Sequence, residues 1–308
     1  MNDIGWLSLH AIYAVLVVVA AAGICLNALL LLTTALTTSL RSAAHILIGC
    51  CALFDTLHEL HAGIAHVESV LGSSTFAGLN LGFIPSLGRS AGVVCAFCIG
   101  IDRMLYMFDV AAYDRMKKKH MLAANIIQRL KRIRRLLQYH FLSIALFCLW
   151  TVFLMIANWT PRQQICTMLA PFHGDSRVLW WNTISGIYII TSLFYSVAWQ
   201  TVKWRGDAAS QQHHDNLFTS ITVVIIVEVS AWFISSILVD LSRHYVAPDH
   251  RPPIHYLSCV LVSSGIAAKP ILLYLQCAEY RRAMHELFTQ KESHEEPDVI
   301  CVHRRATD

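Results

Sequence analysis

Long apolar segments separated by short polar stretches dominate this sequence. A helix of roughly 20 apolar residues is long enough to cross a bilayer. Seven segments reach that length: 4–40, 42–69, 76–108, 138–160, 178–202, 216–239 and 252–277. A shorter segment, 278–289, has the character of an amphipathic helix that lies along a surface. The pattern predicts an all-α membrane protein, a seven-transmembrane helix bundle with a short amphipathic C-terminal surface helix.

The same pattern predicts the domain organisation. We expect residues 1–290 to form a single seven-transmembrane domain, because no polar linker divides the apolar segments. Residues 291–308 are polar, and we expect them to form a disordered cytoplasmic tail.

Composition agrees with a membrane protein and gives no sign of catalysis. Hydrophobic residues make up 56% of the 308 residues and charged residues 14%, whereas a soluble domain usually carries about 25% charged residues. The chain has no nucleophile elbow, phosphate-binding loop or metal-binding histidine pair. We therefore expect no enzyme activity, cofactor or metal site, and no nucleic-acid partner.

Basic residues are concentrated in alternate loops, which predicts the orientation. The loops after the first, third and fifth segments hold Arg41, nine basic residues between 115 and 135, and Lys203 with Arg205. The opposite loops hold only four arginines: Arg162, Arg177, Arg243 and Arg251. We expect a multi-pass protein of the plasma membrane, surrounded by membrane lipids, with its N-terminus outside and its C-terminus cytoplasmic.

The basic loop after the third segment allows two interpretations. Apolar residues recur there at helical spacing, among them Ile126, Leu130 and Ile133, while arginines occupy other positions. Such a helix could lie on the anionic inner leaflet. It could equally be a solvated extension of the fourth transmembrane helix.

Two charges lie at mid-membrane depth in different segments. At 1.5 Å per residue, Asp55 lies about 20 Å along the second segment from Arg41, and Lys269 lies about 14 Å before the surface helix. We predict that the Lys269 ammonium pairs with Asp55 and takes the place of a bound cation. The alternative is that Lys269 reaches a water-filled cavity alone.

Motifs in six of the seven segments resemble those of one receptor superfamily. They are Gly23-Ile-Cys-Leu-Asn27, Leu40-Arg41-Ser42, Ala52-Leu-Phe-Asp55-Thr-Leu-His58-Glu59, Ile99-Gly-Ile-Asp102-Arg103-Met104 with Ala112-Tyr113, Trp150, Tyr195, and Lys269-Pro270 through Tyr274 to Glu279-Tyr280-Arg281. Their order and spacing resemble the rhodopsin-like G-protein-coupled receptors, and most closely the nematode chemoreceptor families, particularly serpentine receptor class sx.

The resemblance implies a function and roles for particular residues. It implies a chemosensory receptor that binds an unknown extracellular small molecule or peptide and switches a site for a heterotrimeric G protein. Arg103, next to Asp102, would be the switch at the cytoplasmic end of the third helix, supported by Tyr195 and Tyr274. A polar core would be formed by four further residues: Asn27, Asp55, Lys269 and Pro270.

The chain departs from the family pattern in several places. Cys166 lies in an outer loop, but its usual partner is missing, because no cysteine lies between Cys51 and Cys95. The fifth segment has no proline, the sixth has Trp232 without the following proline hinge, and Lys269 replaces the usual asparagine. We therefore expect an altered switch, and a weakly signalling receptor-like protein is one possibility.

Arg89 lies about 21 Å outward from Arg103 along the third helix, the depth at which rhodopsin-like receptors contact ligand. Arg89 could bind a carboxylate-bearing ligand, with Glu59 as a second ligand-binding residue. It could instead neutralise Glu59 or Glu228 within the bundle. Three histidines nearby allow proton sensing or a helix lining a wet cavity: His58, His61 and His66.

Two other function classes fit seven spans. An ion-conducting or transporting protein could use the buried charges as an ion path, although no internal repeat of the transporter kind is evident. A retinal-binding pigment would use Lys269 as its Schiff-base lysine, but the residue directly before Pro270 lies too near the cytoplasmic side for a chromophore.

Overall fold

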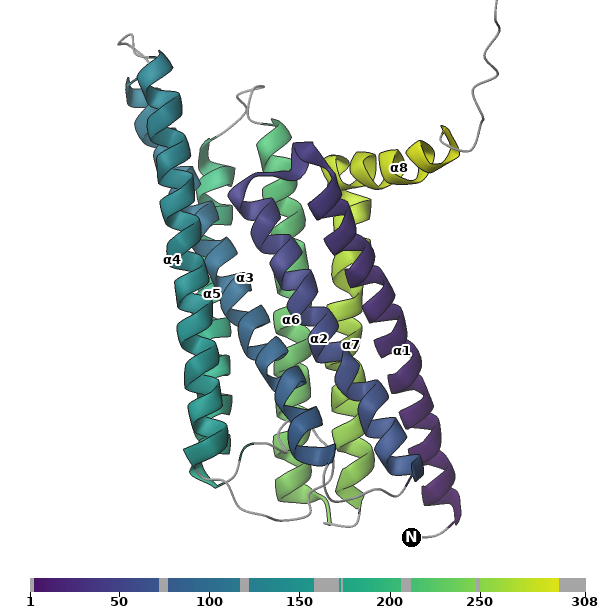
Figure 1. The fold of residues 1–308 in the computed structure, drawn as a ribbon. Helices are drawn as coiled ribbons and strands as arrows, with labels where there is room; N and C mark the ends of the chain where they lie inside the picture. Colours follow the sequence, from purple (N-terminus) through teal and green to yellow (C-terminus); the bar gives the residue numbers. More distant parts are fainter. Residues whose placement is uncertain are drawn as a thin grey trace, which may run out of the picture.

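The chain forms one bundle of long helices in the computed structural model (Figure 1). The structure describes residues 3–71, 77–116, 122–157, 172, 174–205, 212–247 and 250–293. The helices are α1 (Asp3–Leu36), a 3-10 turn η1 (Thr38–Leu40), α2 (Ala43–Leu71), α3 (Ala77–Met116), α4 (Leu122–Ala157), α5 (Asp175–Arg205), α6 (Gln212–Tyr245), α7 (Arg251–Gln276) and α8 (Ala278–Ser293). α8 runs across one end of the bundle, and the N-terminus lies at the other end (Figure 1).

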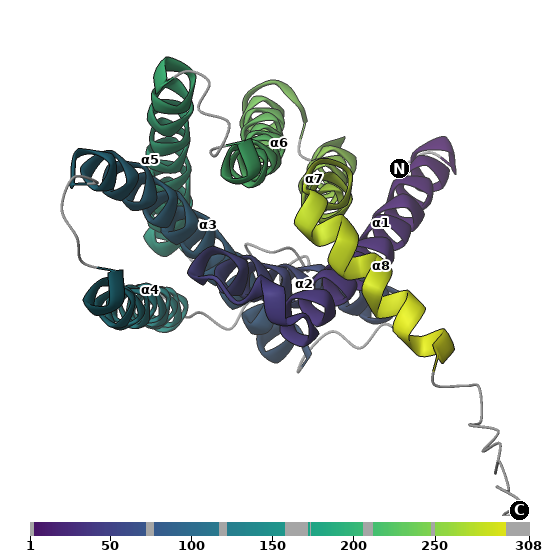
Figure 2. The same cartoon turned by 90° about the horizontal axis from the view of Figure 1, so that it is seen from above.

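Six of the helices contain a stretch long and apolar enough to cross a membrane: α1, α2, α3, α4, α6 and α7. α5 is also 31 residues long and lies within the bundle beside α3 (Figure 2). Its sequence is less apolar, because polar residues such as Asn182 and Thr183 interrupt its apolar and aromatic residues. With α5 as the seventh span, the predicted seven-helix fold is confirmed.

The buried charged groups lie inside the bundle, within a largely apolar core, and large apolar side chains also cover its outer surface. Asp55, Glu59, Arg89, Glu228 and Lys269 are each at most 4% exposed. Large apolar side chains face outward and are more than half exposed, including Val18, Leu36, Leu149, Ile156 and Leu193. This arrangement suits a protein surrounded by hydrocarbon, where a charged group is stable only when it faces the interior of the bundle.

Packing places α2, α3, α6 and α7 around the buried charges. α2 packs along α3 and α1, and α7 lies between α1 and α6. α3 also contacts α4 and α5, which form the other side of the bundle when it is viewed from the α8 end (Figure 2). α3 therefore links the two halves of the bundle.

Several helix boundaries differ from the predicted segments, and two of the differences affect the interpretation. α1 ends at Leu36 rather than continuing to residue 40, and Thr37 adopts an extended conformation before the turn η1. α4 begins at Leu122, well before the predicted start at residue 138, because no glycine or proline interrupts the helix from there to Ala157. The basic segment is therefore continuous with the fourth transmembrane helix, which agrees with the extension interpretation.

Several sequence predictions fall outside the described residues. They concern the loop residue Cys166 and the part of the tail beyond residue 293 that was predicted to be disordered; Asn158-Trp-Thr160, which fits a glycosylation sequon, also lies outside these residues. The surface helix α8 ends at Ser293 rather than at residue 289. The eight cysteines that the structure describes are all unbridged.

Gly88 allows α2 and α3 to approach closely, and this contact can be tested. A Cβ atom at Gly88 would lie 2.8 Å from the Phe54 carbonyl oxygen and 3.0 Å from the His58 nitrogen, which are backbone atoms that cannot rotate away. We expect Gly88→Ala to force the helices apart and to cost about 1–3 kcal/mol. The measurement is the midpoint of thermal unfolding in detergent micelles.

Gly186 on α5 is the matched control for this prediction. A Cβ atom there would meet no atom within 4 Å. Gly186→Ala should therefore be neutral or stabilising by up to about 1 kcal/mol, because alanine favours the helix. Equal effects of the two substitutions would mean that the α2–α3 contact is looser than described.

Candidate functional site

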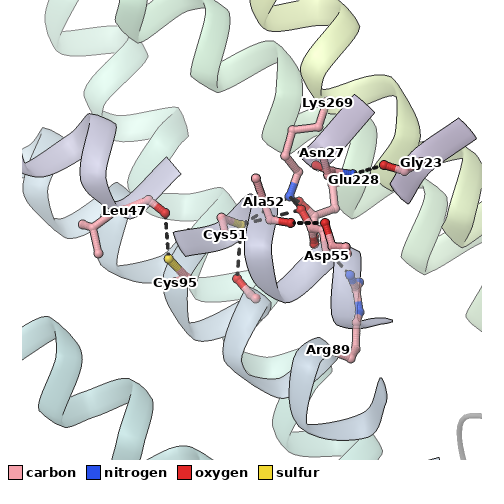
Figure 3. Close-up of polar contacts among 12 residues, drawn as sticks. Gly23, Asn27, Leu47, Cys51, Ala52, Asp55, Arg89, Cys95, Glu228 and Lys269 are labelled. Atoms are coloured by element: carbon pink, nitrogen blue, oxygen red, sulfur yellow. Dashed lines mark hydrogen bonds and ion pairs between the residues drawn. The ribbon is translucent and has the colours of Figure 1, made fainter. Parts of the chain in front are cut away.

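Lys269 and Asp55 lie in contact at the centre of the bundle (Figure 3). The Lys269 ammonium on α7 is 2.7 Å from Asp55 Oδ2 on α2, and both side chains are at most 4% exposed. Lys269 also donates to the Cys51 thiol, whose sulfur is 3.3 Å away. The structure thus places side by side the two charges that their depth in the sequence led us to expect together.

Glu228 on α6 contacts both buried cations. Its Oε2 lies 2.9 Å from the Lys269 ammonium, and its Oε1 accepts a hydrogen bond of 3.1 Å from Arg89 on α3. The Tyr188 hydroxyl on α5 donates to the same Oε1 at 2.9 Å and accepts a hydrogen bond from Arg89. One carboxylate therefore connects α3, α5, α6 and α7.

We call the residues Asp55, Lys269, Glu228, Arg89 and Tyr188 the charge network. The network is built from five helices that are distant in the sequence, and each member is buried. Buried charges are costly unless they are paired, and in the network each cation has at least one carboxylate partner. The network can therefore hold α6 in place relative to α3 and α7.

Aromatic rings enclose Arg89 where it meets α6. Its guanidinium carbon lies 4.9 Å from the Trp232 ring centroid and 5.3 Å from the Tyr188 ring centroid. Stacking over aromatic rings favours a guanidinium that has lost its water. Arg89 therefore adopts the paired arrangement with Glu228 in this structure, and its exposed fraction is only 2%.

Trp180 anchors α5 to α3 near the end of the bundle opposite α8. Its indole Nε1 donates to the Ser90 hydroxyl at 3.0 Å, and its ring stacks on Phe172 with centroids 4.7 Å apart. Phe172 comes directly before α5, so this stack holds the polypeptide that enters the helix. It provides an attachment in the region where the family's disulfide is expected to be missing.

Glu59 stands apart from the charge network. It is only 1% exposed, and neither carboxylate oxygen has a hydrogen-bond partner of normal geometry among the described residues. The Ser263 hydroxyl on α7 and the Arg89 guanidinium are near enough to interact with it electrostatically. The structure therefore does not bring Glu59 into the pair with Arg89 that the sequence allowed.

Asn27 and Pro270 flank the network without joining it. The Asn27 side chain donates to the Gly23 carbonyl of its own helix at 3.0 Å (Figure 3). Pro270 is buried within α7 directly after Lys269 and lacks an N–H group, so the α7 backbone loses one hydrogen bond at this point. The interruption in the α7 hydrogen bonds therefore lies beside the network lysine.

Asp102 and Arg103 lie toward the α8 end of α3. Arg103 Nη2 donates to Asp102 Oδ2 at 2.8 Å, and Arg103 is 8% exposed. Tyr195 on α5 is buried close enough to Arg103 to interact with it electrostatically, and its ring packs against Gly100 one turn earlier on α3. Tyr195 and Arg103 are thus neighbours in this structure, and their role in a switch stays a prediction.

Tyr274 belongs to the junction between α7 and α8 in this structure. Its hydroxyl lies 3.3 Å from His285 Nε2 on α8. A second contact holds α8 to the start of α2, where His45 Nε2 lies 2.9 Å from Glu279 Oε2. Contacts on both sides therefore hold α8 across the end of the bundle.

Cys277 lies at this junction beside the last membrane-spanning helix, and such juxtamembrane cysteines are candidates for acylation, as is Cys301. Cys277 is 1% exposed, and burial raises the pKa of its thiol. A buried and protonated thiol is a poor nucleophile. The second candidate, Cys301, lies outside the described residues.

An apolar cavity lies between the charge network and the α8 end. It is lined by residues of α2, α3, α6 and α7: Ile48, Cys51, Ala96, Ile99, Ile221, Val224, Ile225, Lys269 and Leu273. Apart from Lys269 and the Cys51 thiol, these side chains offer no polar group to a ligand.

Tyr188 and its hydrogen bonds are the part of the site that we did not predict from the sequence. A signal was available, because Tyr188 lies about two helical turns from Tyr195 and on the same side of α5. No group of three or more metal-binding side chains occurs in the described part of the chain.

Comparison with known proteins identifies one family. Residues 20–288 match the sequence model of a family described as serpentine type 7TM GPCR chemoreceptor Srsx. The match includes α2 to α7 in full, with half of α1 and most of α8. Comparison with curated proteins gives no match.

Proposed function

The chain belongs to the Srsx family of serpentine seven-transmembrane chemoreceptors, and we propose that it switches a heterotrimeric G protein when a ligand binds. We place it in the plasma membrane with its N-terminus outside, on the basis of the lysine and arginine counts. The α8 end is then cytoplasmic. The family is one of receptors rather than enzymes, which fits the lack of catalytic motifs.

The contacts of Glu228 are the single observation that supports a switch most directly. They tie α6 to α3 through Arg89 and to α7 through Lys269. Movement of α6 requires these ion pairs to separate, and the apolar cavity beside α6 offers no polar replacement. The network therefore favours one packing of the helices, and a ligand acts by favouring another.

Arg89 supplies the proposed point of contact with the ligand. An extracellular ligand that carries a carboxylate would compete with Glu228 for the guanidinium, because both groups accept hydrogen bonds from the same donors. Release of Glu228 would free α6 from α3. Glu59, the second residue expected at ligand depth, would lie on the opposite side of Arg89, toward α1 and α7.

Arg103 is the proposed cytoplasmic end of the switch, and Arg103→Ala tests it. We expect the variant to reach the cell surface and to lose at least about 90% of the ligand-induced response, because it lacks the cation that would meet the G protein. The measurement is a G-protein reporter in cells exposed to a panel of volatile, acidic and peptide ligands. Surface labelling normalises the signal.

Arg41→Ala is the control for that experiment. Arg41 is exposed at the same end of the bundle, so its removal changes the surface charge without touching the switch. An Arg103→Ala variant that responds like the Arg41→Ala variant would contradict the role of Arg103. Ligand-gated currents in cells without the G protein would favour the ion-conducting alternative.

A further inference from the structure

Glu59 is an acid buried without a cation partner. Its side chain lies near α1 and α7. A Cβ atom added at Gly23 on α1 would lie 3.3 Å from Glu59 Cγ and 3.5 Å from the Ala267 side chain on α7. Only 1% of Glu59 is exposed, and its carboxylate forms no ion pair with a described cation, although the Ser263 hydroxyl on α7 is near enough to interact with it. Gly23 and Ala267 therefore leave one side of the Glu59 side chain apolar.

The buried charges around Glu59 do not balance. Two cations, Arg89 and Lys269, accompany three carboxylates, Asp55, Glu59 and Glu228. Asp55 and Glu228 hold both cations in ion pairs. Glu59 is left as the excess carboxylate, and an ionised carboxylate without a partner is very costly in an apolar interior.

Groups on each neighbouring helix affect the charge state of Glu59. Asp55, one turn away on α2, disfavours a second negative charge, while Arg89 on α3 favours it from a distance. On α7, the Ser263 hydroxyl and the Cys259 thiol face the same region and carry no compensating charge. His58, the next residue on α2, is also buried and has contacts of its own.

We propose that Glu59 is a proton-binding site, and that the receptor carries it as a neutral carboxylic acid at neutral pH. One proton balances the charges of the cluster. A metal cation would need several oxygen ligands around it, whereas no group of three or more metal-binding side chains occurs among the described residues. A proton needs only one carboxylate oxygen.

Loss of this proton would disturb the charge network. Ionised Glu59 would repel Asp55 and would compete with Glu228 for Arg89, since Arg89 already interacts with both acids. The ties between α6 and α3 would weaken as a result. Protonation of Glu59 therefore couples the packing of the helices to proton binding.

Infrared spectroscopy of the purified full-length chain in lipid nanodiscs tests the charge state directly. At neutral pH we expect a carbonyl band of a protonated carboxylic acid, which Glu59→Gln removes completely. Glu286→Gln on the exposed face of α8 is the matched control and should leave the band unchanged. Absence of the band from the unsubstituted chain, or its persistence in Glu59→Gln, overturns the proposal.

Stability measurements provide a second, independent test that needs no ligand or G protein. Raising the pH from neutral to alkaline removes the proton, so the unfolding midpoint of the unsubstituted chain should fall by about 3 °C or more. Glu59→Gln mimics the neutral acid and should lack this fall, while Glu286→Gln retains it. Parallel curves for all three proteins, or a sodium-dependent stabilisation that Glu59→Gln abolishes, would reject a proton site.

Discussion

Glu228→Ala is expected to destabilise the receptor by about 3–5 kcal/mol. Arg89 loses its carboxylate partner, and Lys269 keeps only Asp55. The Tyr188 hydroxyl loses its acceptor in the same step. The measurement is the midpoint of thermal unfolding in micelles of one detergent. Few other single substitutions in the bundle should have a larger effect.

Asp240→Ala on the same helix is the matched control. The Asp240 side chain is 71% exposed and its distance to His244 is 4.0 Å. Exposed ion pairs contribute little, so the change should stay within about 0.5 kcal/mol. Equal effects of Glu228→Ala and Asp240→Ala would show that Glu228 is not the centre of the network.

A milder change at the same position separates stability from signalling. Glu228→Gln keeps the size of the side chain but removes its charge, so α6 is held less firmly to α3 and α7. We expect basal G-protein activation per receptor at the cell surface to rise in this variant. Unchanged basal activation would mean that the network stabilises the fold without controlling the proposed switch.

Lys269→Met is expected to cost a similar amount, about 3–5 kcal/mol, because Asp55 then has no cation and Glu228 keeps only Arg89. Methionine has nearly the same length and remains apolar, so the lost charge is the main change. Unfolding midpoints of the same detergent preparation measure the effect. Arg282→Met on the exposed face of α8 is the control and should change stability by no more than about 0.5 kcal/mol.

The double variant Asp55→Leu/Lys269→Met shows whether the two charges act as a pair. Removing both partners leaves no uncompensated charge at this point, so the double variant should be more stable than the sum of the single effects predicts. A coupling of about 1–3 kcal/mol is expected. Additive effects would indicate that Lys269 is solvated independently of Asp55.

Much of the fold followed from the chain itself. Apolar length predicted seven spans, and they are present, although α5 is the least apolar of them. Depth along the helices also predicted that Asp55 and Lys269 would come together, since a rise of 1.5 Å per residue places both near the middle. The start of α4 was less predictable, because a basic amphipathic segment can either lie on a membrane or extend a helix.

The depth of a residue along its helix does not determine which side chain it will pair with. Glu59 and Glu228 were equal candidates for Arg89 in the sequence, and the structure pairs Arg89 with Glu228 alone. Tyr188 and Trp232 complete that contact from α5 and α6. The rotation of each helix about its own axis decides which side chains meet, and this rotation depends on packing against several helices at once.

Seven spans, the expected orientation, the Asp102-Arg103 pair and the receptor family were therefore available from the order of residues, because hydrophobic length, loop charge and motif spacing are properties of the chain. The tertiary structure alone decided that Glu228 joins Arg89 to Lys269 and that Glu59 is left without a cation. Those outcomes depend on helix rotation and on contacts such as Gly88 against α2, where segments distant in the sequence come within van der Waals reach.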